Sequence, residues 1–261
     1  MLEIRGVRFD PARPVVIVPL TGVDLRELTD QAAAVRRAAP DVVEWRVDLA
    51  ERLAGDLRGT VAAAHRLTDA LGGIPLLVTV RTRPEGGRAP VDPDGHLDTL
   101  RALMDAGATD LVDVEMLQPG AHAAVVAAHE AGVAVVGSHH DLRSTPSRGE
   151  MVGVLRRMAG AGADVCKIAV TPQDPGDVLE LLGATWTASR ELDRPVVTVS
   201  MGALGGVSRV AGGVFGSAAT FASVGRGSAP GQLDVATVRA ALAALQPDGA
   251  GRERPGAGDW R

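Results

Sequence analysis

The stretch ADVCKIAV at residues 163–170 has the form of a buried strand, a short run of small and branched residues with a lysine inside it. Seven further apolar runs occur along the chain, at 14–20, 42–49, 76–81, 111–116, 133–138, 196–201 and 221–224. Amphipathic or alanine-rich stretches lie between them and predict helices, as at 24–39, 57–71, 95–106 and 174–191. Eight strand-then-helix units of roughly 30 residues predict an α/β fold, a closed (β/α)8 barrel of the TIM type.

The boundaries of these units carry the expected signals. Helix N-caps are predicted at Asp24, Ser147 and Asp174, and helix ends at Gly107, Gly132 and Gly162. An open doubly wound sheet is the competing fold, but the turn after the first run, TGVD at 21–24, is not a glycine-rich phosphate loop. Residues 2–9 alternate apolar and polar, which predicts a short extra strand before the barrel. We therefore expect one domain over 1–245 and a disordered Gly/Pro/Arg-rich tail over 246–261.

Composition excludes several classes of partner. The 261 residues are 46% hydrophobic but only 2% aromatic, so the core must be built from aliphatic side chains. The net charge of −5 and the absence of a basic run argue against nucleic acid and anionic membranes as partners. Cys166 is the only cysteine, which excludes an internal disulfide and suits a reducing compartment. With neither a signal-peptide pattern nor an apolar stretch of about 20 residues, we expect a cytoplasmic protein.

Lysine usage singles out one residue. Lys167 is the only lysine among 27 basic residues; the rest are arginine. Arginine replaces lysine wherever a solvated positive charge suffices, but guanidinium stays protonated and does not replace a nucleophilic amine. Lys167 is therefore a site candidate, with chance survival at a surface position as the alternative. Burial inside a strand disfavours the ammonium form and so favours the neutral amine that a Schiff base requires.

The C-terminal ends of the strands, where barrels place their active sites, carry the polar residues. Glu44, Arg46 and Asp48 alternate along the second run and should point together, as should Asp113 and Glu115 on the fourth. Charges gathered on one face of a buried strand must pair with one another or bind something polar. A structural ion-pair network inside the barrel and a ligand site are both consistent with this pattern.

A histidine pair ends the fifth run, beside the lysine strand. His140 is placed to shuttle a proton at neutral pH, whereas His139 should alternate to the opposite face. Zinc is disfavoured because side chains of consecutive strand residues diverge, so we expect no metal site.

The loops after the last two strands have the composition of an anion site. Residues 201–217, MGALGGVSRVAGGVFGS, are rich in glycine and hold one charge, Arg209, and SAPGQ follows at 228–232. This corner of a barrel often binds an anion, and arginine with hydroxyl and amide donors suits a carboxylate or phosphate. A tight-turn loop without a ligand is the alternative.

Taken together, these segments resemble the type I 3-dehydroquinate dehydratases over about residues 14–245. The resemblance rests on motifs that occur in order along the chain: EWRVD at 44–48, R-x-x-x-E-G-G from Arg81, D-x-E at 113–115, SHHD at 138–141, KIA from Lys167, MG-x-x-G-x-x-SR-x-x-G-x-x-FGS from Met201 and SAPGQ from Ser228.

The resemblance implies a reaction and a role for each matched residue. Lys167 would form an imine with the carbonyl of 3-dehydroquinate, His140 would be the general base and Glu85 the acid that orients it. The remaining matched residues would bind substrate: the carboxylate and a nearby hydroxyl at Arg209, Ser228 and Gln232, and the ring hydroxyls at Glu44, Arg46 and Arg81. Loss of water would give 3-dehydroshikimate, a step of the shikimate pathway. The resemblance implies no metal or organic cofactor, and a homodimer.

Two departures and two alternatives accompany the resemblance. Pro19 stands where several members have a small polar residue, and His139 and Leu142 stand where others often have an aromatic. A class I aldolase would explain Lys167 but not the carboxylate-binding set around Arg209. A non-catalytic sensor of quinate-like ligands would be expected to lose the lysine or the histidine, and this chain keeps both.

Overall fold

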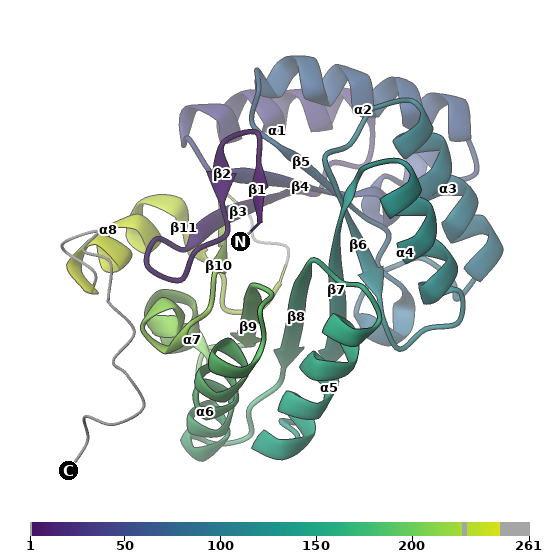
Figure 1. The fold of residues 1–261 in the computed structure, drawn as a ribbon. Helices are drawn as coiled ribbons and strands as arrows, with labels where there is room; N and C mark the ends of the chain where they lie inside the picture. Colours follow the sequence, from purple (N-terminus) through teal and green to yellow (C-terminus); the bar gives the residue numbers. More distant parts are fainter. Residues whose placement is uncertain (1, 226–228, 246–261) are drawn as a thin grey trace, which may run out of the picture.

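A computed structural model describes residues 2–225 and 229–245 of the chain. Eight parallel strands form a barrel, and helices surround it (Figure 1). The strands are β3 (Val15–Leu20), β4 (Val42–Arg46), β5 (Leu76–Thr79), β6 (Leu111–Glu115), β7 (Ala134–Asp141), β8 (Val165–Val170), β9 (Val196–Ser200) and β10 (Ala219–Ser223). All eight correspond to the predicted runs. The expected tail at 246–261 and the predicted ligand Ser228 lie outside the described residues.

The strands pair in sequence order from β3 to β9, and β10 pairs with β3. The ring closes between β9 and β10, where the Ala218 N–H donates to the Val196 carbonyl at 2.7 Å and Ser217 bridges Val196. A short strand, β11 (Leu233–Asp234), pairs in parallel with the end of β10. The predicted barrel is therefore confirmed.

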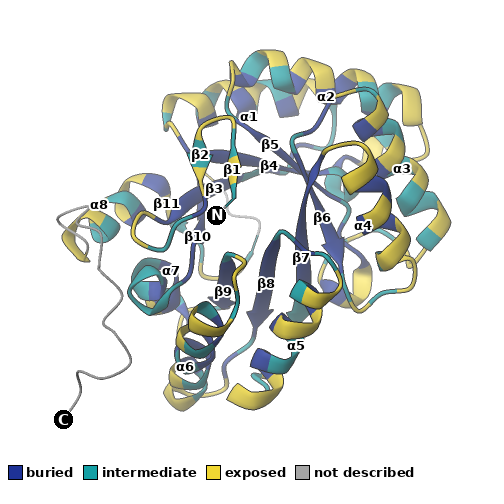
Figure 2. Cartoon of the chain, in the orientation of Figure 1, coloured by how far each residue is buried: buried dark blue, intermediate teal, exposed yellow. Residues whose placement is uncertain are grey.

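The helices alternate with the strands as expected and bury their inner faces (Figure 2). They are α1 (Leu25–Arg37), α2 (Leu57–Leu71), α3 (Pro93–Asp105), α4 (Ala121–Glu130), α5 (Arg148–Gly160), α6 (Pro175–Glu191), α7 (Gly206–Ala211) and α8 (Val235–Leu245). The predicted caps are present: the side chains of Asp24, Ser147 and Asp174 each accept a backbone N–H of the first helical turn. Within the described ranges, no helix is long and apolar enough to cross a membrane.

Two local predictions need correction. The segment expected as one strand at 2–9 is a hairpin, β1 (Glu3–Ile4) and β2 (Val7–Arg8), because Arg5 and Gly6 both adopt positive φ and reverse the chain. The second run ends as a strand at Arg46, and 47–49 turn into the 3-10 helix η1 (Val47–Leu49). Asp48 is therefore not on the strand face shared by Glu44 and Arg46; it folds back onto Arg46.

The inward-facing positions change character along the strands. Near the strand starts they are aliphatic, for example Val42, Leu111 and Val165, and the N-terminal hairpin packs against this layer. Two residues further on, the same face of the same strands carries Glu44, Asp113 and Lys167. The barrel therefore has an apolar bottom and a charged top.

Candidate active site

Lys167 lies at the centre of the charged end, on β8, with a side chain that is 6% exposed. Its Nζ donates to Asp113 Oδ2 at 3.3 Å and lies 4.8 Å from the centre of the Phe221 ring. The apolar residues Ala169, Val199 and Met201 form the wall beside it. The amine thus has a carboxylate on one side and an apolar surface on the other.

His140 lies one residue before the end of β7, next to the lysine strand β8, and Glu85 holds it. Glu85 ends the 3-10 helix η3 (Arg83–Glu85), and its Oε2 lies 2.9 Å from His140 Nδ1 and accepts the His140 backbone N–H at 3.1 Å. A carboxylate at Nδ1 fixes the tautomer that carries its proton there and leaves Nε2 unprotonated. Burial, followed by the charges of Arg81, Lys167, His139 and Arg46, holds the pKa of His140 well below its usual value of 6.5. The imidazole is therefore neutral at neutral pH, as a base must be.

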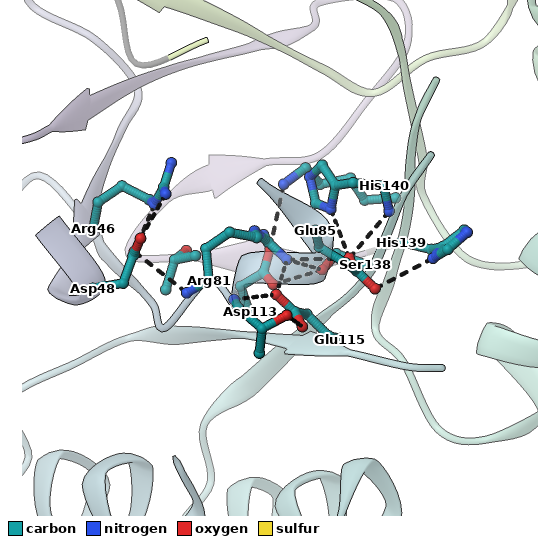
Figure 3. A network of polar contacts seen from close by, with 12 residues as sticks. Arg46, Asp48, Arg81, Glu85, Asp113, Glu115, Ser138, His139 and His140 are labelled. Atoms are coloured by element: carbon teal, nitrogen blue, oxygen red, sulfur yellow. Dashed lines mark hydrogen bonds and ion pairs between the residues drawn. The ribbon is translucent and has the colours of Figure 1, made fainter. Parts of the chain in front are cut away.

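Arg81, two residues after β5, sits under this dyad and bonds to side chains of β6 and β7 (Figure 3). Its Nη2 donates to Asp113 Oδ2 at 2.8 Å, and its Nη1 donates to Glu115 Oε1 at 3.0 Å and Ser138 Oγ at 2.9 Å. Burial alone would lower the pKa of Arg81, but the carboxylates around it, Asp113 first, raise it. The guanidinium is a fixed positive charge in the floor of the site.

The two carboxylates beside Arg81 differ. Burial would raise the pKa of Asp113, but the charges of Arg81 and Lys167 and a hydrogen bond from Ser138 lower it, so this carboxyl is ionised. For Glu115, burial outweighs Arg81 and the hydrogen bonds from Thr82, and its pKa is raised. The group that faces the lysine is thus the more firmly charged one.

The loop that carries Glu85 is anchored at both ends. Thr82 donates to Glu115 through its backbone N–H at 2.8 Å and its hydroxyl at 2.6 Å. Asp48 accepts the backbone N–H groups of Arg81 at 3.3 Å and Arg88 at 3.0 Å. Gly87 closes the turn because a Cβ there would lie 2.0 Å from the Arg81 carbonyl oxygen. These contacts explain the R-x-x-x-E-G-G spacing.

A second charged pair borders the site on β4. Arg46 donates to Asp48 through Nε and Nη2, both at 2.8 Å. Glu44, two residues earlier, accepts the Thr79 hydroxyl at 2.8 Å. Glu44 and Arg46 both line the cavity.

Arg209 approaches from the opposite side, on α7. The residue is 2% exposed; its Nη2 donates to the Pro230 carbonyl at 2.9 Å, and its buried Nε has no partner among the described residues. Burial lowers the pKa of Arg209 to about 10. A buried guanidinium with an unused donor is suited to an anion entering from the cavity.

These side chains surround an open cavity at the charged end of the barrel. Of the residues predicted from the sequence, the cavity brings together Lys167, His140, Glu85, Glu44, Arg46, Arg81, Arg209 and Gln232. Sequence reasoning placed Asp113 on the correct face but did not identify it as the partner of Lys167, and it missed Phe221. The D-x-E alternation was the available signal for Asp113; nothing local marked Phe221.

Comparisons with known proteins agree with this geometry. A family model described as type I 3-dehydroquinase matches residues 16–248. The curated 3-dehydroquinate dehydratase of Klebsiella pneumoniae (strain 342) is 41% identical over 241 residues, covering 91% of this chain and 96% of that protein. The enzyme of the same name from Bacillus subtilis (strain 168) is 40% identical over 245 residues, covering 93% and 96%.

Solved structures give the same result. The crystal structure of 3-dehydroquinate dehydratase from Geobacillus kaustophilus superposes with a TM-score of 0.89 at 36% identity, covering 94% of this chain and 96% of that one. A type I enzyme from Clostridium difficile, solved with covalently modified comenic acid, gives 0.89 at 34% identity, covering 94% and 97%. Sequence, fold and family model coincide over nearly the whole length, and the chain belongs to the type I 3-dehydroquinase family.

Proposed function

We propose that this chain is a hydro-lyase that eliminates water from 3-dehydroquinate to give 3-dehydroshikimate, a step of the shikimate pathway, through an imine on Lys167. The observation that carries the proposal is the cavity at the charged end of the barrel, which holds a buried amine, a neutral imidazole and an arginine whose Nε has no partner among the described residues. Those three groups match a substrate with a carbonyl, an acidic C–H beside it and a carboxylate.

The first step joins Lys167 to the substrate. The Nζ lone pair attacks the C3 carbonyl carbon, and the resulting carbinolamine takes up a proton from solvent and loses its oxygen as water to leave a protonated imine. The Asp113 carboxylate, 3.3 Å from Nζ, stabilises the positive charge of this iminium. The apolar wall of Ala169, Val199 and Met201 limits water around the bond.

The second step moves a proton. His140 takes a proton from C2 through Nε2, and the C–H electron pair enters the iminium to form an enamine. The enamine then expels the C1 hydroxyl, which leaves as water with the proton that His140 carries. Glu85 stabilises the imidazolium that exists between these events. Hydrolysis of the product imine releases 3-dehydroshikimate and restores the amine.

The substrate is oriented by groups on opposite sides of the cavity. Arg209 binds the carboxylate through its Nε, which has no partner among the described residues, and Gln232 lines the same cavity. The family resemblance assigns Ser228, which lies outside the described residues, to the same subsite. Glu44 and Arg46 bind ring hydroxyls. This division keeps the carboxylate away from the acidic residues of β4 and β6.

Arg81 belongs to the proposed binding set with a qualification from geometry. Its guanidinium is already engaged by Asp113, Glu115 and Ser138. We assign it chiefly to holding the charged floor in place, with contact to a ring hydroxyl as a secondary role.

The proposal also covers cofactors, cellular location and oligomeric state. It needs no metal or organic cofactor, because the iminium is itself the electron sink. A cytoplasmic location is supported by the single cysteine, and a homodimer by the family resemblance. Light scattering coupled to size exclusion tests the dimer: a mass near 27 kDa, that of one chain, would contradict it.

Borohydride trapping tests the central claim. Incubation with 3-dehydroquinate and sodium borohydride should add one reduced adduct to the intact mass, and peptide mapping should place it on Lys167. Because this is the only lysine, Lys167→Arg leaves the α-amine as the one remaining primary amine and is a clean control. A folded protein that gives no adduct, or an equal adduct in Lys167→Arg, contradicts the imine. A phosphorylated ketose in place of the substrate tests the aldolase alternative and should give no adduct.

A further inference from the structure

Glu85 is held between two imidazoles rather than one. Its Oε2 lies 2.9 Å from His140 Nδ1, and its Oε1 lies 3.3 Å from Nδ1 of the neighbouring His139 (Figure 3). Both histidines come from the end of β7, and the carboxylate side chain is only 3% exposed. Each oxygen of the acid thus has its own imidazole partner.

The two histidines face different surroundings. His140 lines the cavity and its side chain is 11% exposed, whereas His139 is not among the lining residues and its side chain is 27% exposed. Strand alternation turns His139 away from the barrel interior. It still reaches Glu85 because η3 places the acid over the end of β7. One imidazole therefore contacts the cavity, and the other contacts solvent.

Charged groups around the dyad come from several elements. Arg81 Nη1 lies 3.6 Å from Glu85 Oε2, and Lys167 on β8 and Arg46 on β4 act on His140 from the cavity side. Asp141 lies on the same strand; burial would raise its pKa, but backbone hydrogen bonds from Arg143 and Ser144 outweigh burial and lower it. Among the groups that lower the pKa of His140, after burial, Arg81 and Lys167, is His139 itself.

We propose that His139 is a positioning residue for the dyad: its ring holds the outer oxygen of Glu85, so that the inner oxygen stays on His140 Nδ1. The inference rests on the proposed function for its kinetic consequence. The hydrogen bond to Oε1 also draws part of the carboxylate charge to the outer oxygen. Without this hydrogen bond the inner oxygen would be the stronger acceptor and would favour the protonated form of His140.

Two variants test the hydrogen bond. His139→Gln keeps an N–H donor for Glu85 Oε1, and His139→Phe removes it. The acid limb of kcat/KM should move up by about half a pH unit in His139→Phe and return in His139→Gln. In addition, kcat should fall a few-fold in His139→Phe and recover in His139→Gln. His122→Gln, at an exposed position on α4, is the matched control and should change neither quantity.

A titration of His140 followed by imidazole NMR gives the same answer without turnover. The midpoint of His140, assigned by comparison with His140→Asn, should rise in His139→Phe and return towards that of the unsubstituted protein in His139→Gln. A midpoint in His139→Phe equal to that of the unsubstituted protein would overturn the inference even if the enzyme is active. If the protein has no dehydratase activity, the NMR shift still decides the inference, so the two proposals fail separately.

Discussion

The two ends of the barrel are built from the same eight strands but use their polar groups differently. At the bottom, Asp41, Asp110 and Asp164 each precede a strand and accept the backbone N–H of the strand before it, from Val16, Leu76 and Val135 at 2.8 to 2.9 Å. At the top, Asp113 and Glu115 bond to side chains that surround the cavity.

The contrast separates stability from function. A carboxylate that caps a strand satisfies backbone donors and completes the fold. Buried charges held by other buried charges contribute little net stability, since desolvation offsets their attraction, but they fix the geometry of a site. Substitutions at the bottom should therefore change the free energy of unfolding, and substitutions at the top should change turnover.

The largest expected difference lies within one strand. Lys167→Arg keeps a positive charge beside Asp113 but loses the nucleophile, so turnover should fall by about 10⁴-fold or more while the protein stays folded. Val165→Ala, two residues earlier on the same face, should keep its turnover and lose about 2 kcal/mol of stability. Assays of kcat beside urea unfolding check both. Comparable turnover in the two variants would contradict the assignment of stability to the bottom of the barrel and of turnover to the top.

The next effect concerns the base. His140→Ala should reduce kcat by about 10²–10⁴-fold, because the proton step loses its acceptor while the imine still forms. Stopped reactions with borohydride should trap more adduct than in the unsubstituted enzyme. Full activity in this variant would show that another group takes the proton.

Arg209 tests the comparison because its effect on the free energy of unfolding and its effect on substrate binding are measured separately. Arg209→Met removes a buried charge with an unsatisfied donor, so the free energy of unfolding should stay level or rise by up to about 1 kcal/mol. KM should rise about 10–100-fold, the value of a charge-assisted hydrogen bond. Arg26→Met, at an exposed position on α1, should change neither. An unchanged KM would place the carboxylate elsewhere.

At the bottom, Asp110→Ala should lower the free energy of unfolding by about 1–2 kcal/mol, because it strips the acceptor from the Leu76 N–H and the partner from Arg5. Turnover at a temperature well below unfolding should not change. Asp69→Ala, exposed on α2, is the reference and should leave stability as it is. If Asp110→Ala lost turnover while it was fully folded, the bottom of the barrel would be shown to affect catalysis at the top.

The smallest effect is the pH dependence of stability from His140. Its folded pKa lies below the ordinary 6.5, so below about pH 6.5 the unfolded chain binds a proton that the folded protein does not. The stability that neutral His140 contributes is fully present above the unfolded pKa. It is lost as the pH falls from about 6.5 towards the folded pKa. Urea unfolding over this range should show a flatter slope in His140→Asn. The acid limb of kcat/KM should likewise lie below pH 6.5.

Local patterns were sufficient for much of the architecture. Period-two alternation, helical stretches and cap residues act within a few residues, so the eight strands, the helix caps and the placement of Lys167 and His140 on neighbouring strands followed from the printed sequence. The hairpin at Arg5–Gly6 was not predicted because a two-residue turn leaves the alternation of apolar and polar residues on either side intact.

Contacts between distant segments were decided only by the tertiary structure. Barrel closure brings Asp113 to Lys167 across 54 residues and Glu85 to both histidines across 54 and 55. The Nε of Arg209 has no partner among the described residues because the packing of α7 brings no acceptor of theirs within reach. The sequence by itself determined which groups face the interior, because side-chain direction is a local property of a strand. Which of them touch was decided by the curvature of the closed sheet, because distances across the barrel depend on all eight strands together.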